Sequence, residues 1–213
     1  MGLPDHLLDG LPEQVPEIKS DTPHYEAVGR FVTSFANAES AVHILARHLS
    51  GMPDDKARIV FGGMRLPDLT DIIRHFMKID NIPLDQRNVI GECLTQLVAI
   101  SKRRHSIVHR TATFFDGKLS VSNVLTSKHL ASSEHEIFEI EELRSMQRDC
   151  GTIYLKLDNI INPNPTNPFS LVDAFLLGRP WQYKHAPPKT PNLKPRAKSP
   201  KPKRQLPASR ERP

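Results

Sequence analysis

The stretch from Lys102 to Arg110 (KRRHSIVHR) combines side chains that bind phosphate with side chains that transfer protons. A guanidinium group can donate two parallel hydrogen bonds to a phosphate and offset its negative charge. An imidazole can give or take a proton near neutral pH. Arg104 and His109 lie five positions apart, and His105 directly follows the arginine. This combination predicts acid–base chemistry on a phosphate ester, provided that the three side chains meet in one cleft.

A long helix is predicted to carry this stretch at its end. It begins at about Leu84, and Arg104 falls in its apolar series Ile90, Cys93, Leu97, Ile100, Ile107. A charge on an apolar face is costly unless it is paired. Glu39 likewise falls in the apolar series of the first predicted helix, which begins at Asp21-Thr22-Pro23. We therefore expect Arg104 and Glu39 to form a buried ion pair.

The geometry of an uninterrupted helix separates the two key side chains. At 100° per residue, positions 104 and 109 point about 140° apart. Their convergence therefore requires that the helix bends or ends near Ser106 to Val108, or that a second subunit completes the site.

The remaining helices follow from capping residues and apolar spacing. Asp21-Thr22-Pro23 starts a helix that ends at Ser50-Gly51, and a short helix is predicted over 54–61. Pro67 starts the next helix, and Glu141 starts the last one. Their predicted apolar series are Tyr25, Val28, Val32, Phe35, Val42, Ala46 and Leu49 in the first, Leu69, Ile72, Phe76 and Ile79 in the next, and Leu143, Met146, Cys150, Ile153, Leu157 and Ile160 in the last.

Between the last two long helices the spacing changes from helical to alternating. Asp116-Gly117 is a strong signal for a tight turn between two strands, and 135–140 could add a third strand. The predicted fold is therefore mainly α: an up-and-down four-helix-type bundle with a small β-hairpin insertion, at about 111–140, before the last helix.

Composition divides the chain into four parts. Residues 1–20 are predicted to be an irregular arm, 21–162 the helical domain, 163–183 a packed-back or irregular segment, and 184–213 a disordered tail rich in Pro, Lys and Arg.

The basic character of the protein is concentrated in that tail. The sequence pI is about 9.3. Ten of the 29 Lys and Arg residues and one of the 24 acids lie in 184–213, so the tail carries +9 and the rest, with 19 basic and 23 acidic residues, carries −4. Attraction to a polyanion is therefore expected first from the tail. Its candidate nucleic-acid-binding residues are Lys194, Arg196, Lys198, Lys201, Lys203 and Arg204.

Two lone cysteines and the absence of long apolar runs bear on location. Cys93 and Cys150 fall at apolar helical positions, which favours a reducing compartment over a disulfide framework. The sequence from Met1 to His6 lacks the layout of a signal peptide, and no apolar run approaches the roughly 20 residues that cross a bilayer. We expect a cytoplasmic protein with no membrane partner.

The hexapeptide Arg104-His105-Ser106-Ile107-Val108-His109, at the end of a buried helix in a small bundle, resembles the hallmark of the HEPN (higher eukaryotes and prokaryotes nucleotide-binding) family. That hallmark is an arginine, a polar residue, three further residues and a histidine. The resemblance covers about residues 23–162 by layout and is specific at the hexapeptide. It implies a metal-independent endoribonuclease, such as a toxin or defence effector, that works as a homodimer without a cofactor. An antitoxin or another regulatory protein is among the partners that it implies.

Under this resemblance each residue of the candidate site has an expected role. His109 transfers the proton, Arg104 binds the phosphate, His105 assists, and Glu39 orients Arg104. These types suit metal-free RNA cleavage, which needs a group to take the 2′-hydroxyl proton and a cation to stabilise the transition state. Lys102, Arg103 and Arg110 are expected to be solvated charges at the helix end that can contact nucleic acid.

Three alternatives remain open from the sequence. The chain could be a non-catalytic module that binds RNA or a nucleotide, or a protein-interaction module in which Arg104 is structural, because cations at a helix C-terminus are favoured by the macrodipole. His105 and His109 could also bind a metal on one helix face, although the sequence offers no convincing third ligand.

Overall fold

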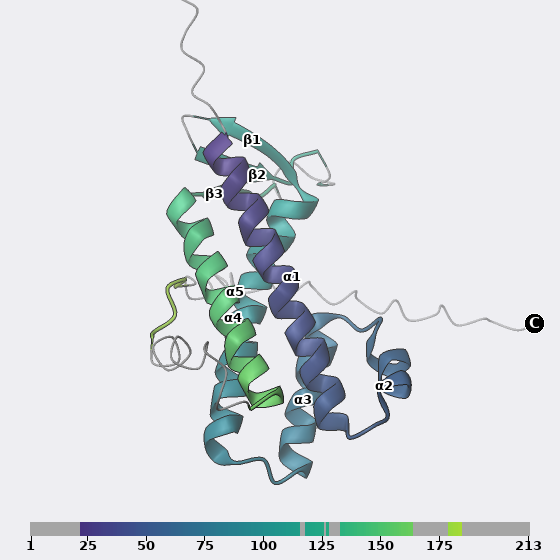
Figure 1. Cartoon of the computed structure of the whole chain (residues 1–213). Coiled ribbons are helices and arrows are strands. Elements are labelled where there is room, and N and C mark those ends of the chain that lie inside the picture. The colour runs from purple at the N-terminus through teal and green to yellow at the C-terminus, as the bar shows by residue number, and fades with distance from the viewer. Residues whose placement is uncertain (1–21, 116–117, 126, 128–132, 164–178, 185–213) are drawn as a thin grey trace, which may run out of the picture.

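The computed structural model describes residues 22–115, 118–125, 127, 133–163 and 179–184. The predicted mainly helical fold, with a small antiparallel sheet before the last helix, is confirmed (Figure 1). The helices are α1 (Thr22–Ser50), α2 (Asp54–Phe61), α3 (Leu66–Ile79), α4 (Leu84–His109) and α5 (Ile140–Ile161). The strands are β1 (Thr111–Phe115), β2 (Lys118–Ser122) and β3 (His135–Phe138). The irregular arm, most of 163–183 and nearly all of the basic tail lie outside the described residues.

The helix directions follow from the lengths of the connections. The short link between α3 and α4 makes these helices antiparallel, and α5 returns alongside α4 from the sheet end of the bundle (Figure 1). Helices α1 and α3 run the same way, because α2 and the loop 62–65 carry the chain back along α1. Gly51 adopts φ +62, the left-handed conformation that ends α1 as predicted.

The buried face of α1 differs from the predicted one. The predicted series began at Tyr25, but that side chain is 62% exposed, and Val28 and Val32 are only partly buried. The core side of α1 is instead formed by His24, Ala27, Phe31, Phe35, Ala38, Ala41, Val42, Leu45 and Ala46. Four of these are alanines, which allow the close packing of α1 along α5. Glu39 consequently lies at the margin of the core and not in its middle.

The predicted buried face of α3 also differs from the observed one, whereas the apolar series predicted for α4 and α5 are largely correct. Ile79 of α3 is 78% exposed, and the buried residues include Ile73 and Met77. All five apolar residues predicted for α4 are buried, and so are the α5 series members from Leu143 to Leu157. The two buried thiols are free cysteines, and burial raises the pKa of Cys93 and Cys150 to about 12.

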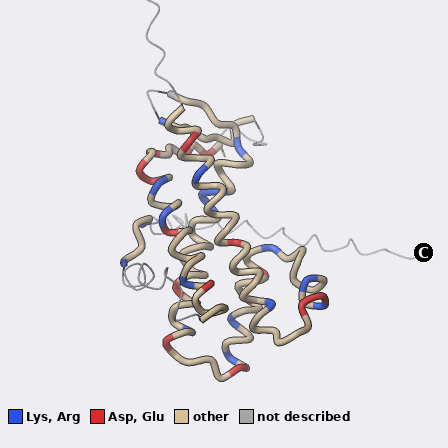
Figure 2. Tube along the Cα trace, viewed as in Figure 1, with Lys and Arg blue, Asp and Glu red and all other residues tan. Residues whose placement is uncertain are grey.

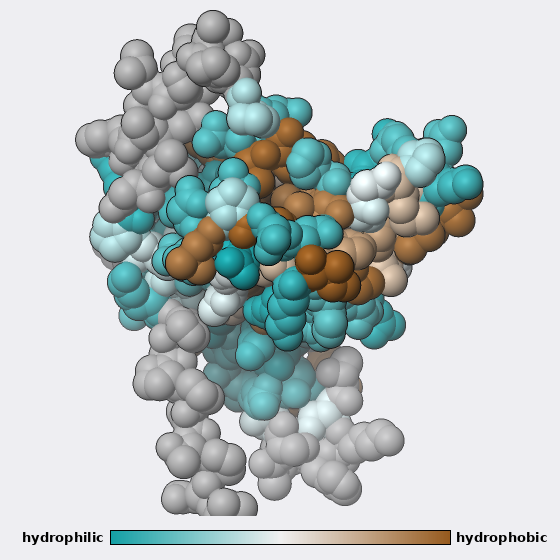
Figure 3. Space-filling view, turned by 90° about the horizontal axis from the view of Figure 1, so that it is seen from below, coloured by the Kyte–Doolittle hydropathy of each residue, from teal (hydrophilic) through white to brown (hydrophobic). Residues whose placement is uncertain are grey.

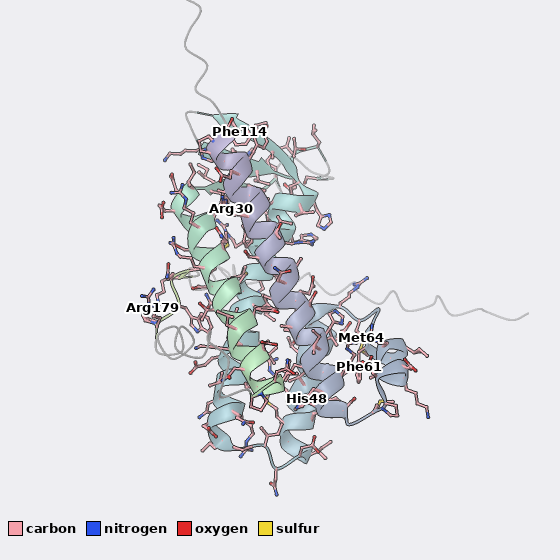
Figure 4. The ribbon with its side chains drawn as sticks, in the orientation of Figure 1. Arg30, His48, Phe61, Met64, Phe114 and Arg179 are labelled. Atoms are coloured by element: carbon pink, nitrogen blue, oxygen red, sulfur yellow. The ribbon has the colours of Figure 1, made fainter. Side chains whose placement is uncertain are left out.

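The sheet lies against the C-terminal end of α4 and the first turns of α1. Its order is β1-β2-β3, and Phe115 pairs with Lys118 as expected for a tight turn, although 116–117 are outside the described residues. Phe114 lies over the start of α1 (Figure 4), with its ring 5.5 Å from His24 and 4.7 Å from Tyr25 between centroids. Leu119, Val121 and Phe138 fill the space between the sheet and the helices.

Residues 179–184, which we call the C-terminal segment, pack against α4 and α5. Asp149 accepts hydrogen bonds from the backbone N–H of Gln182 and of Tyr183, each at 2.9 Å. The Gln96 side chain donates to Asp149 at 2.9 Å and to the Tyr183 carbonyl at 3.0 Å. Lys156 lies 4.7 Å from the centre of the Trp181 ring. The helical domain therefore includes residues far beyond α5.

Charged positions of both signs are distributed over the described helices and are interspersed along them (Figure 2). At the end away from the sheet, brown apolar areas are separated by teal polar ones (Figure 3). The most exposed large apolar residues on α2 and around the α3–α4 connection are Ile59, Ile79 and Leu84. Within the described residues, no helix is both long and apolar enough to cross a bilayer.

Candidate functional site

A groove of about 970 Å³ opens beside the last turns of α4. Phe35 and Glu39 of α1 form one wall, and the loop and first turn of α3, from Met64 to Pro67, form another. Met64 lies where this loop passes α1 (Figure 4). Side chains of α4 from Ser101 to Arg110 and Glu136 of β3 complete the lining.

All four residues predicted to be catalytic border this one groove: Glu39, Arg104, His105 and His109. Helix α4 continues to His109, and Arg110 then turns the chain into an extended conformation. Of the conditions for convergence, a helix end before His109 is therefore not met within the chain. Arg104 and His109 nevertheless both line this groove, and so do His105 and Ser106 between them.

Arg104 is held by an aromatic ring and not by the predicted carboxylate. Its guanidinium carbon lies 5.6 Å from the centre of the Phe35 ring, one helical turn before Glu39 on α1. Within the described residues, no ion pair joins Arg104 to Glu39, so that prediction is wrong. The Nε of Arg104 is fully buried and has no hydrogen-bond partner in this part of the chain. A buried donor without an acceptor is costly, so this nitrogen lowers the stability of the fold and does not add to it.

The two histidines lie side by side at the end of α4. Their ring centroids are 4.6 Å apart and the ring planes are tilted by 46°. Both residues are exposed, so solvent and a bound molecule can reach them. One bound molecule can therefore contact both rings at once.

Arg103 and Arg110 are not the solvated charges that we expected. Arg103 donates to Glu142 of α5 at 2.8 Å and to Glu136, and its guanidinium carbon lies 4.0 Å from the centre of the Phe138 ring. Arg110 donates to Glu134 at 2.7 Å and to Glu136 at 2.8 Å. The expectation failed because the acidic partners are 24 to 39 positions away in the sequence. Lys102 is exposed, as expected.

Sequence reasoning missed two charged residues of the groove. Arg65 stands at the N-cap of α3, and no local pattern marks it. Glu136 could have been found, because it lies two positions before the fully buried Phe138 and therefore on the inward side of β3. An acid at an inward strand position requires a partner, and the nearest cations are those of the α4 end.

The other predicted sites can be placed only in part. The tail residues Lys194, Arg196, Lys198, Lys201, Lys203 and Arg204 lie outside the described residues. Across 22–115, 118–125, 127, 133–163 and 179–184, no group of three His, Cys, Asp or Glu side chains is arranged to hold a metal ion. The two histidines therefore gain no third ligand there.

Replacing Arg104 by methionine should leave the free energy of unfolding within about 1 kcal/mol of the wild type. Methionine keeps most of the apolar stem and removes a buried donor that has no acceptor in the described structure. Urea denaturation of both proteins measures the difference. A loss above about 3 kcal/mol would show that Arg104 has a structural partner within the fold.

No family model, no curated protein and no solved structure matches this chain.

Proposed function

We propose that this chain is a metal-independent endoribonuclease of the HEPN type that acts as a homodimer. The observation that supports it most is the groove itself, where Arg104, with a buried and unpartnered Nε, accompanies two adjacent exposed histidines. A fixed cation beside a pair of proton-transfer groups is what cleavage of a phosphodiester by the neighbouring hydroxyl requires.

In the proposed reaction, His109 removes the proton from the 2′-hydroxyl of the RNA. The oxygen attacks the adjacent phosphorus, while the Arg104 guanidinium offsets charge on the phosphate oxygens. The leaving 5′-oxygen takes a proton from the neighbouring His105. The products are a 2′,3′-cyclic phosphate and a 5′-hydroxyl, so no metal-bound water is needed.

The groove also supports a homodimeric arrangement. It is open, so RNA or the surface of a second subunit could enter it. An antitoxin or another regulatory protein that covered the same groove would block the reaction. We propose such a partner, and a role as a toxin or defence effector, from the resemblance to the HEPN family.

The test is incubation of purified full-length protein with RNA in excess EDTA. We expect fragments that end in 2′,3′-cyclic phosphate, and their loss in Arg104→Ala. Cleavage that needs added Mg²⁺, or equal cleavage by the variant, would contradict the proposal.

A second candidate is a non-catalytic RNA-binding module, which the +9 charge of residues 184–213 favours. In the same assay this alternative predicts that RNA is bound but recovered intact. Its binding would weaken steeply with salt.

A further inference from the structure

Glu136 of β3 is a shared acceptor for three side chains at the end of α4. Its Oε1 accepts from the Ser106 hydroxyl at 2.7 Å and from Arg110 at 2.8 Å, and its Oε2 accepts from Arg103. Both carboxylate oxygens are therefore engaged. The side chains are 22% exposed for Glu136, 23% for Arg103 and 18% for Arg110. Such partly buried, shared pairs are screened less than surface ones.

These contacts hold the turn that carries His109. His109 is the last helical residue, and the last turn of a helix frays because its carbonyl groups lack partners within the helix. Ser106 lies three positions before His109 and Arg110 one position after it, and Glu136 binds both. The sheet therefore restrains the helix end on either side of the histidine.

The same carboxylate determines which cations the groove presents. Glu136, with Glu142 and Glu134, engages Arg103 and Arg110. Within the described part of the chain, the lining residues Arg65, Lys102 and Arg104 form no ion pair. A polyanion that enters the groove would meet these three cations first.

We propose that Glu136 is a positioning residue, which fixes the His109 turn and keeps Arg103 and Arg110 away from the RNA. The inference rests on the proposed function for its RNA and turnover readouts. Loss of the Glu136 carboxylate should therefore both strengthen RNA binding and slow RNA cleavage.

The variant that tests this is Glu136→Gln, which keeps the shape and removes the charge. We expect kcat to fall about tenfold or more, because small displacements of a reacting group are costly. RNA affinity, measured with a mixed-sequence oligonucleotide in a His109→Ala background, should rise about fivefold. The slope of log affinity against log salt should steepen by about 1.

Two further variants separate charge from folding. Glu134→Gln makes the same charge change beside the same strand, but Glu134 is 64% exposed, binds only Arg110 of these side chains and does not line the groove. Its kcat and affinity should stay within about twofold of wild type. Glu136→Asp retains the charge, so its salt slope should remain that of the wild type.

Amide hydrogen exchange gives a readout that does not depend on RNA. The Arg110 N–H donates to the Ser106 carbonyl at 3.2 Å, and its exchange should accelerate at least tenfold in Glu136→Gln but not in Glu134→Gln. Unchanged exchange at Arg110, or kcat and RNA affinity that both stay at wild-type values, would overturn the role of Glu136. A wild-type protein that leaves RNA intact would instead refute the proposed nuclease, and the exchange result would still decide the positioning role.

Discussion

Replacement of His109 by alanine should reduce RNA cleavage by about a hundredfold to ten-thousandfold. The ring is exposed in the groove and contacts the His105 ring at 4.6 Å between centroids, so its removal takes away a proton-transfer group. The helix should persist, because His109 is an exposed residue of the last helical turn, and substitutions at such positions usually change the free energy of unfolding by about 0.5 kcal/mol or less. Initial rates of cleavage in EDTA, together with circular dichroism of both proteins, measure the effect.

His75→Ala is the matched control for this substitution. His75 is also an exposed histidine on a helix, but its Nδ1 lies 2.7 Å from the Asp71 carbonyl oxygen on α3 and its ring is not part of the groove. Its cleavage rate should stay within about twofold of the wild type. An unchanged rate in His109→Ala, or equal losses in both variants, would exclude His109 from the reaction.

Replacement of Asp149 by alanine should lower the free energy of unfolding by about 3–5 kcal/mol. Asp149 is 2% exposed and accepts hydrogen bonds from Gln96 and from two backbone N–H groups of the C-terminal segment. The substitution leaves these donors without an acceptor in a buried place. Urea denaturation measures the loss, and faster amide exchange at Gln182 and Tyr183 would locate it in the C-terminal segment.

Asp158→Ala provides the comparison on the same helix. Asp158 accepts one exposed side-chain hydrogen bond, from Asn162 at 2.9 Å, so its removal should cost less than about 1 kcal/mol. If Asp149→Ala were equally mild, the C-terminal segment would not contribute to the stability of the helical domain.

The limits of the helices and strands could be read from the sequence because local chemistry decides them. Pro23, Pro67 and Gly51 mark helix ends through their own backbone preferences, and Asp116-Gly117 predicts a hairpin, whose strands β1 and β2 do pair. The apolar series of α4 and α5 could also be predicted from the sequence, because large apolar residues line the buried sides of these helices.

The buried face of α1 was decided by its neighbours. Spacing rules favour large side chains such as Tyr25, but the contact with α5 uses small ones such as Ala38 and Ala41, which let the two helices approach closely. A helix packed against several neighbours buries a wide stripe, and the sequence does not show where its edges lie. The place of Glu39 at the margin of the core follows from this.

The sequence by itself determined the helical scaffold and the nearness of Arg104, His105 and His109 along one helix. Only the tertiary structure decided the partners of the charges. Arg104 lies over Phe35 and not beside Glu39, and Arg103 and Arg110 are engaged by acids of β3 and α5. The physical reason is that an ion pair depends on the distance between two charged groups in space. That distance is set only when the helices and the sheet pack together, whereas the position of a helix end depends on the few residues around it.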